Sequence, residues 1–198
     1  MAWDKGFEAA LSPKAIAIVG VSSKPRGWGA NDIIDCLQGL HFEGRIYPVN
    51  PNATEIRGLK VYPNLGSIPE HVDLVIVCVP APAVPGVLED CIAAGAKNVH
   101  IFTAGFEETG EAEGRELGEK VKEIARRGGL RIIGPNCMGL YVPAARISTL
   151  AGSVVESGPV AFISQSGTLA ENYNRYAEAS GFRFSKVFSF GNAYVLDS

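Results

Sequence analysis

Cysteine, histidine and basic charge are all scarce in this 198-residue chain, and each scarcity excludes a class of protein. The four cysteines lie far apart without a Cys-x-x-Cys pair, so we predict neither a metal site nor a disulfide framework. A formal net charge of −3 provides no basic surface for nucleic acid. The longest apolar stretch, residues 74–88, contains three prolines and is therefore no membrane span. Without a basic and apolar leader at its N-terminus, the chain is expected to be cytoplasmic.

What the chain does contain is two turns of small residues, each between an apolar run and a segment that suits a helix. The first, Gly20-Val-Ser-Ser-Lys-Pro25, follows residues 15–19, and the second, Ser164-Gln-Ser-Gly-Thr168, follows residues 160–163. The first backbone N–H groups of a helix have no intrahelical acceptor, and the helix dipole is positive there, so such turns favour anions. The sequence therefore predicts phosphorylated ligands at two places.

Short apolar runs rich in β-branched residues alternate with helix-like segments along the chain. This alternation is typical of a doubly wound α/β fold, in which helices cover both faces of a parallel sheet. Ligands of such sheets bind at the carboxyl ends of the strands. The predicted strands are 15–19, 45–49, 74–79, 98–102, 131–133 and 160–163, with a further apolar run at 186–190. The predicted helices are 30–40, 83–94, 111–127 and 169–180.

A domain boundary is expected after Val142. Residues 143–158 are rich in small residues and show no strong period, and a new strand, turn and helix follow them. We therefore divide the chain into a domain at 1–143, a connector at 144–157 and the beginning of a second domain at 158–198. One strand, one helix and one further apolar run cannot bury a two-sided sheet, so an exposed apolar surface and a partner are expected.

A dinucleotide site is the first alternative that the N-terminal turn suggests. Its glycines are badly spaced, because Gly27 and Gly29 lie well past the strand end and Asp32 occupies the place of the third small residue. The second strand is followed by Asn50 and not by the Asp or Glu that would bind the ribose hydroxyls. Both departures disfavour an oxidoreductase that binds NAD(P) and leave a loop that suits phosphate.

Three further predicted strands end in proline-rich or small-residue segments at the ligand-binding edge of the sheet. These segments are residues 80–82, 103–106 and 134–137, and together they leave a flat groove that suits an extended ligand. Cys137, beside Asn136, is either a reactive thiol or a small apolar residue near a turn. No histidine or basic residue adjoins it in sequence, which favours the second interpretation.

Seven segments, in their order along the chain, carry a resemblance to a known family. The chain resembles the α-type region of ADP-forming acyl-CoA synthetases, which belong to the succinyl-CoA synthetase superfamily, over essentially its whole length. The resemblance implies a CoA-binding Rossmann-like domain followed by the beginning of a flavodoxin-like α/β domain. The segments are IAIVGVSSKP, GRIYPVNPN, VDLVIVCVPAPAVPGVLEDC, TAGFEETG, GPNCMGL, AFISQSGTL and FSFGNA.

The same resemblance implies two sets of binding residues. One set would bind CoA, from its phosphates through its adenosine end and pantetheine arm to its thiol. The other would form a helix N-terminus that receives the phosphate of a phosphohistidine, with a glycine loop near the acyl phosphate. The CoA set is Gly20, Ser22, Ser23, Lys24 and Pro25 for the phosphates, Val49, Asn50 and Pro51 for adenosine, Val79, Pro80, Ala81, Thr103, Ala104 and Gly105 for pantetheine, and Asn136 and Cys137 for the thiol. The phosphate set is Ser164, Ser166, Gly167 and Thr168, with Gly191 and Asn192 in the glycine loop.

The chemistry that the resemblance implies is acid, CoA and ATP giving acyl-CoA, ADP and phosphate through an acyl phosphate and a phosphohistidine. None of His41, His71 and His100 occupies the place of that histidine, and no ATP-grasp domain, which would bind ATP with Mg, is found in the sequence. We therefore expect mainly a CoA binder, which acts with an ATP-grasp domain or subunit in an oligomeric full-length enzyme on a carboxylic acid or acyl phosphate. The alternative is a non-catalytic CoA-sensing module, such as the synthetase-like region of a protein lysine acetyltransferase.

Overall fold

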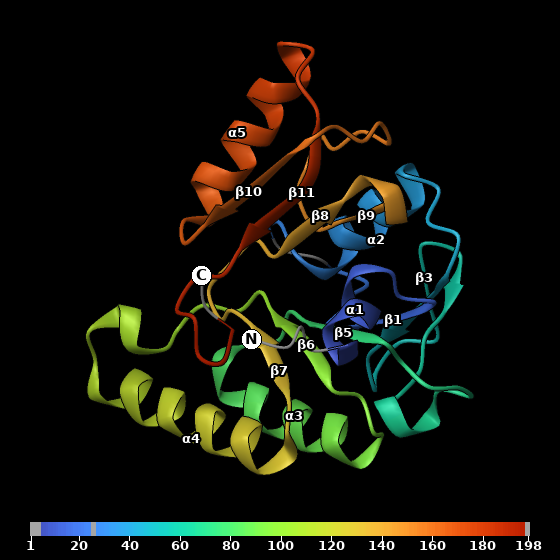
Figure 1. Ribbon diagram of the computed structural model, residues 1–198. Helices are drawn as coiled ribbons and strands as arrows, with labels where there is room; N and C mark the ends of the chain where they lie inside the picture. Colours follow the sequence, from blue (N-terminus) through green and yellow to red (C-terminus); the bar gives the residue numbers. More distant parts are fainter. Residues whose placement is uncertain (1–4, 25–26, 197–198) are drawn as a thin grey trace.

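The computed structural model describes residues 5–24 and 27–196, which form two α/β lobes (Figure 1). The first lobe is built on a parallel sheet with the strand order β2-β1-β5-β6-β7, in which Ile16 of β1 lies opposite Ile46 of β2 and Leu74 of β5. This sheet confirms the predicted doubly wound α/β class. Its strands are β1 (Ala15–Val19), β2 (Arg45–Val49), β5 (Leu74–Val77), β6 (Asn98–Ile101) and β7 (Arg131–Ile133).

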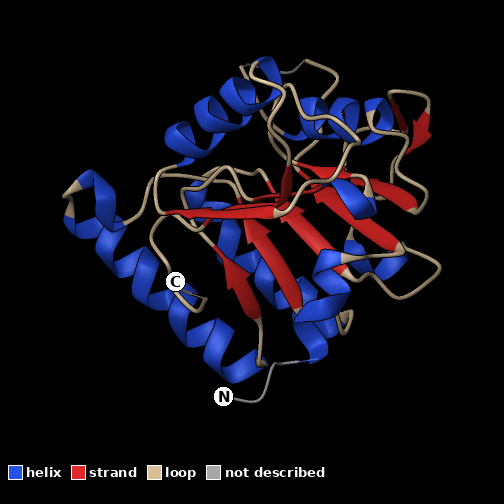
Figure 2. Cartoon of the chain, turned by 45° about the horizontal axis from the view of Figure 1, so that its top comes forward, coloured by secondary structure: helices blue, strands red, loops and turns tan. Residues whose placement is uncertain are grey.

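Helices cover both faces of this sheet because successive strand side chains point to opposite faces (Figure 2). On one face α3 (Val84–Ala93) and α4 (Ala112–Gly128) lie side by side and pack on residues such as Val75 and Val99. On the other face α1 (Lys5–Leu11) and α2 (Ala30–Gly39) pack on Ile16, Ile18 and Ile76. All five of these strand residues are fully buried, so hydrophobic burial on both faces holds the lobe together.

The second lobe is a smaller sheet with the order β10-β11-β8-β9, in which β10 and β11 are parallel and the other pairs antiparallel. Helix α5 covers one face of it, with Tyr141, Phe184 and Val187 buried beneath. Sequence analysis missed β8 and β9, because β9 has only two residues and neither strand adjoins a helix-like segment, as the predicted strands do. The elements are β8 (Leu140–Val142), β9 (Ile147–Ser148), β10 (Val160–Ser164), β11 (Phe184–Ser189) and α5 (Gly167–Ala179).

These strands bear on the expected domain division at residue 143. β8 lies before that boundary and β9 lies within the expected connector, yet the two pair with each other, and β8 pairs with β11. Residues of β8 and β9, among them Leu140 and Ile147, also pack in the core on the α2 face of the first sheet. The segment around the boundary is therefore shared by both lobes.

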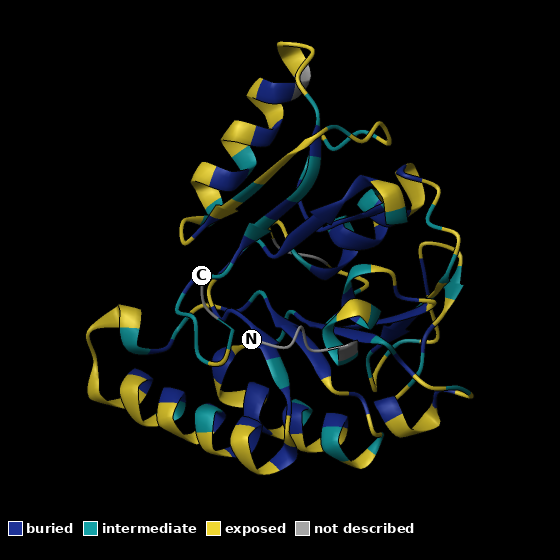
Figure 3. Ribbon diagram, in the orientation of Figure 1, coloured by how far each residue is buried: buried dark blue, intermediate teal, exposed yellow. Residues whose placement is uncertain are grey.

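The outer strand of the second lobe is exposed (Figure 3). In β10 the side chain of Ile163 is 57% exposed, and on α5 Leu169 and Tyr176 are 54% and 66% exposed. This finding agrees with the expectation of an exposed apolar surface, since a sheet edge and its neighbouring helix face remain uncovered.

The remaining elements are short. Helix α1 was not predicted from the sequence, whereas each predicted strand and helix is present with its ends shifted by a few residues at most. Within the described ranges, no helix has the length and apolar character that a membrane span requires. The short elements are β3 (Glu55–Ile56), β4 (Leu59–Lys60) and the 3-10 turns η1 (Leu65–Ser67), η2 (Ala81–Ala83), η3 (Glu107–Thr109) and η4 (Pro143–Ala145).

Candidate functional site

A cavity of about 300 Å³ opens where the strand order of the first sheet reverses, between β1 and β5. In open α/β sheets ligands bind at this switch point. The connections that follow the two strands lead to opposite faces of the sheet, so a crevice opens between them at the carboxyl ends of the strands. Residues that follow β1, β5 and β6 line the cavity together with the first turn of α2. They are Gly20 and Ser22, Cys78, Val79 and Pro80, Phe102 and Thr103, and Gly27, Trp28, Gly29, Ala30, Asn31 and Asp32.

The turn after β1 is held in shape by an asparagine of α2. The backbone N–H of Ser22 donates to Asn31 Oδ1 at 3.0 Å, and Asn31 Nδ2 donates to the Ser22 carbonyl at 2.8 Å. Lys24 N–H donates to Ser22 Oγ at 3.0 Å. Gly20 has a φ of +103°, and a Cβ there would lie 2.6 Å from the Cys78 carbonyl oxygen. Glycine is therefore required for the ends of β1 and β5 to approach so closely.

Two residues of this region stabilise the fold beside the cavity. Asp32 accepts from the backbone N–H of Gly29 at 2.8 Å and so fixes the start of α2. Asn50 Nδ2 donates to the Val21 carbonyl at 2.5 Å, so Asn50 supports the turn after β1. Sequence analysis also missed Trp28, which is 38% exposed on the cavity wall and could have been noticed as a lone tryptophan in a glycine-rich turn.

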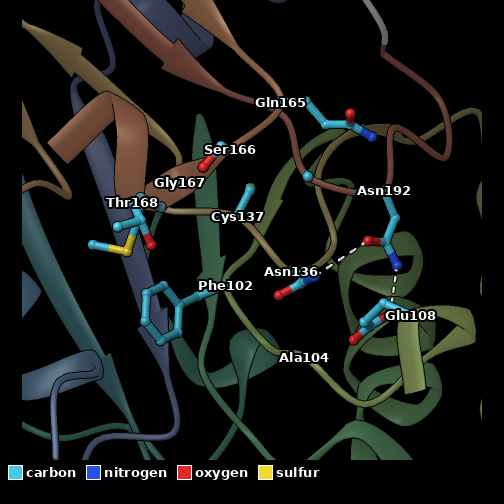
Figure 4. Close-up of a pocket in the computed structure, with 12 residues that line it drawn as sticks. Phe102, Ala104, Glu108, Asn136, Cys137, Gln165, Ser166, Gly167, Thr168 and Asn192 are labelled. Carbon is cyan, nitrogen blue, oxygen red and sulfur yellow. Dashed lines mark hydrogen bonds between the residues drawn. The ribbon is translucent and has the colours of Figure 1, made fainter. Parts of the chain in front are cut away.

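A larger cavity, of about 620 Å³, lies between the two lobes (Figure 4). The turn after β7 and the turn before α5 form its two sides, so it brings together residues that the resemblance assigned to the CoA thiol and to the phosphate. Phe102 lines this cavity as well as the first one, which makes the two cavities neighbours. The lining residues are Phe102, Ala104, Glu108, Asn136, Cys137, Met138, Gln165, Ser166, Gly167, Thr168, Gly191 and Asn192.

The phosphate turn begins helix α5 at Gly167. Ser166 Oγ accepts from the backbone N–H of Leu169 at 3.2 Å, and the buried Ser164 donates its hydroxyl to the Ser166 carbonyl at 3.1 Å. A Cβ on Gly167 would lie 2.7 Å from Met138 Cγ, so the turn packs directly against the turn after β7. The N–H groups of Gly167 and Thr168 belong to the first turn of the helix, where the helix supplies no acceptor.

Glu108 is a cavity residue that sequence analysis missed, although it lies in TAGFEETG, one of the segments that carry the resemblance. Its Oε1 accepts from the N–H groups of Gly105 at 2.6 Å and Phe106 at 3.1 Å, and its Oε2 accepts from Asn192 Nδ2 at 2.6 Å. Partial burial raises the pKa of Glu108, but these hydrogen bonds outweigh it and leave the pKa below its usual value. Glu108 is therefore a carboxylate at neutral pH.

Cys137 is not an activated thiol. Burial raises its pKa to about 12, so the protonated form dominates at neutral pH. Behind it the buried His100 has an Nε2 3.3 Å from the Cys137 carbonyl oxygen, and an oxygen acceptor requires that Nε2 carries the proton. Burial lowers the pKa of His100 to about 4, so the ring is neutral. These observations favour the small apolar residue over the reactive thiol.

Eight predicted site residues that the structure describes do not line either cavity: Ser23, Lys24, Val49, Asn50, Pro51, Ala81, Gly105 and Ser164. Ser23, Lys24 and Pro51 are exposed, and Val49 and Ala81 are buried beneath the surface. Pro25 lies outside the described residues. Among the residues that the structure describes, no group of three or more His, Cys, Asp or Glu side chains could hold a metal ion.

Residues 14–143 match the family described as "CoA binding domain". The chain belongs to this CoA-binding domain family. Residues 157–198 of the CoA-binding chain match a second family, described as "Succinyl-CoA ligase like flavodoxin domain". The two matches agree with the resemblance found in the sequence.

Two relatives of the chain are ADP-forming CoA ligases. It is 40% identical over 196 residues to acetate–CoA ligase (ADP-forming) I subunit alpha of Pyrococcus furiosus, covering 96% of this chain and 42% of the relative. It is 34% identical over 189 residues to 4-hydroxybutyrate–CoA ligase (ADP-forming) of Nitrosopumilus maritimus, covering 94% and 27%.

A solved structure gives the same result. The dinucleotide-forming acetyl-coenzyme A synthetase 1 of Ca. Korarchaeum cryptofilum, in complex with phosphate and ADP, matches with a TM-score of 0.89 and 38% identity, covering 97% of this chain and 41% of that one. The CoA-binding chain thus spans less than half the length of each of these three relatives. It matches the CoA-binding α region of the ADP-forming acyl-CoA synthetases, which confirms the prediction from the sequence.

Proposed function

We propose that this chain is the CoA-binding and phosphate-receiving part of an enzyme that converts a carboxylic acid, CoA and ATP to acyl-CoA, ADP and phosphate. The observation that carries the proposal is the larger cavity, which contains both Asn136 and the Ser166–Thr168 turn. In the thiol step the CoA sulfur attacks the carbonyl carbon of an acyl phosphate, and the bond from that carbon to the phosphate oxygen breaks. The thiol and the departing phosphate must therefore meet in one place.

The path of CoA is proposed along the two neighbouring cavities. Its phosphates lie near Ser22, Ser23 and Lys24, and the pantetheine arm runs past Val79 and Thr103 toward the larger cavity. Thr103 supports this path, because its Oγ1 donates to the Val79 carbonyl at 2.7 Å and ties the ends of β5 and β6 together. The shared wall at Phe102 joins the two halves of the path.

The departing phosphate is proposed to bind at the start of α5. Fixed N–H donors at a helix N-terminus stabilise a transferred anion without reorganising during the reaction. Among the described residues that line the larger cavity there is no lysine or arginine, and Glu108 is the charged residue. The positive end of the helix dipole and the amide groups of Asn136 and Asn192 would therefore offset the charge.

Further components are required for the whole reaction. We propose an ATP-grasp domain or subunit that binds ATP with Mg, an oligomeric full-length enzyme, and a cytoplasmic location. The exposed apolar side chains of Ile163, Leu169 and Tyr176 support a partner on the second lobe. The substrate is named only as a carboxylic acid, since the relatives include ligases of acetate and of 4-hydroxybutyrate.

Calorimetric titration of the chain with CoA, and in parallel with NAD, tests the proposal. We expect CoA to bind with a dissociation constant in the micromolar range and NAD to give no response. Binding of NAD without binding of CoA would contradict the proposal. A third titration with inorganic phosphate on the CoA-loaded chain separates the synthetase from a CoA sensor, which needs no phosphate site.

A further inference from the structure

The segment after β11, residues 190–196, leaves the second sheet and returns to the first lobe. The N–H of Asn192 donates to the Pro135 carbonyl at 3.0 Å, and the N–H of Tyr194 donates to the Gly134 carbonyl at 3.1 Å. In the other direction, the N–H of Gly191 donates to the Gln165 carbonyl, beside the phosphate turn, at 3.1 Å. This short segment is therefore bonded to both sides of the larger cavity.

The side chain of Asn192 extends the connection to the loop after β6 (Figure 4). Its Nδ2 donates to Glu108 Oε2 at 2.6 Å, and its Oδ1 accepts from Asn136 Nδ2 at 3.4 Å. Glu108 in turn accepts the N–H groups of Gly105 and Phe106. A continuous chain of hydrogen bonds thus runs from the proposed pantetheine loop, through Asn192, to the turn before α5.

A second contact holds the same segment against the first lobe. The Tyr194 hydroxyl donates to Glu107, and the Tyr194 ring meets the ring of Phe106 edge-on with centroids 5.9 Å apart. Lys122 Nζ lies 4.6 Å from the centroid of the Tyr194 ring. Gly118 leaves room for the ring, since a Cβ there would collide with the Tyr194 hydroxyl. Two consecutive glutamates, Glu107 and Glu108, therefore connect Tyr194 and Asn192 to the first lobe.

We propose that Asn192, anchored by Glu108, is a positioning residue that couples CoA binding to the geometry of the phosphate turn. The inference rests on the proposed function and describes how the CoA site and the phosphate site affect each other. CoA that orders Gly105 and Asn136 also orders the two groups that hold the Asn192 amide, and with them Gly191 against Gln165. Phosphate that binds afterwards loses less conformational entropy in this segment, so CoA binding raises the affinity for phosphate. By linkage, phosphate raises the affinity for CoA by the same factor.

Hydrogen exchange of the 198-residue chain, with and without saturating CoA, tests the coupling. We expect CoA to slow exchange of the amides in residues 190–196 by roughly fivefold or more. Asn192→Asp sets a carboxylate against Glu108 and is expected to abolish this slowing. In the double variant Glu108→Gln with Asn192→Asp, the new amide at position 108 donates to the new carboxylate at position 192. The hydrogen bond is kept with donor and acceptor exchanged, so the double variant is expected to restore the slowing. Asn64→Asp is the matched control, because Asn64 caps η1 away from the cavity by accepting hydrogen bonds, as a carboxylate also does.

The outcomes separate this inference from the proposed function. If calorimetry shows that CoA binds but exchange in residues 190–196 is unchanged, the inference is overturned and the proposed function stands. It is overturned equally if Asn192→Asp retains the slowing, or if the exchanged pair folds and does not restore it. Absence of CoA binding to the unmodified chain would overturn both. Should Asn192→Asp fail to fold, Asn192→Ser, which removes the bridge without adding charge, replaces it in the comparison.

Discussion

Replacement of Gly191 by alanine is expected to detach the segment after β11 from the first lobe. Gly191 has a φ of +54°, in the left-handed region that L-residues disfavour. An added Cβ would lie well inside the van der Waals distance of the carbonyl oxygens of Pro135 and Asn136. These oxygens belong to the backbone and cannot rotate away. The segment around Gly191 must therefore move away from Pro135 and Asn136.

The magnitude follows from two contributions. A left-handed conformation costs an L-residue about 1–2 kcal/mol. Separation also breaks the hydrogen bonds from Asn192 to Pro135 and from Tyr194 to Gly134, each of which contributes about 1 kcal/mol. We therefore expect Gly191→Ala to destabilise the attachment by about 3–4 kcal/mol.

Gly129→Ala is a matched control for the backbone contribution. Gly129 has a φ of +60°, and an added Cβ would meet nothing within 4 Å. The control should cost only the conformational part, so the two variants should differ by about 2 kcal/mol. The assay is native-state hydrogen exchange at Asn192 and Tyr194, combined with urea unfolding, because the segment can open locally while the sheets remain folded. Equal effects of the two variants, with unchanged exchange at both amides, would refute the reasoning.

Three further predictions concern CoA binding, the core and pH. Lys24→Glu should weaken CoA binding by about 1–3 kcal/mol in calorimetry through charge reversal, whereas Lys120→Glu, on the exposed side of α4, should not change it. Leu88→Ala should lower the free energy of unfolding in urea by about 2–5 kcal/mol, because Leu88 is fully buried between α3 and the sheet. The pKa of His100 is about 4 in the folded chain, against 6.5 in the unfolded chain. The stability that comes from burying a neutral ring is therefore fully present above pH 6.5 and is lost as the pH falls toward 4, because the unfolded chain binds the proton first. His100 should thus lower the unfolding free energy by about 1 kcal/mol between pH 6 and 5, a contribution that His100→Gln removes and that the exposed His71→Gln retains.

The first lobe could be predicted from the sequence because its signals are local and strong. The run Ala15–Val19, for example, is buried on both faces, so it is continuously apolar, and Gly20 follows it directly. β8 and β9 gave no such signal, since neither adjoins a helix-like segment and β9 has only two residues. The pairing of β8 with β11 depends on residues more than 40 positions away.

The cavity residues divide in the same way. A turn of small residues before a helix, such as Ser164–Thr168, is recognisable because every element of the signal lies within a few positions. Glu108 and Trp28 were missed, because an exposed acid or aromatic residue in a loop has many ordinary explanations until its neighbours are known. Asn50 stays a predicted ligand contact, and only the structure shows that its amide also supports the turn after β1 from 29 positions away.

The order of apolar runs and helices in this chain is by itself enough to specify a doubly wound sheet with ligands at the carboxyl ends of its strands, because burial on two faces leaves a pattern in every strand. The sequence also identifies the family, since its seven separate segments occur in one fixed order along the chain. Which of these segments meet around the larger cavity is a different matter. Asn136, Gln165 and Asn192 come together only because the chain after β11 folds back on the first lobe, and hydrogen bonds across such separations leave no periodic signal in the sequence.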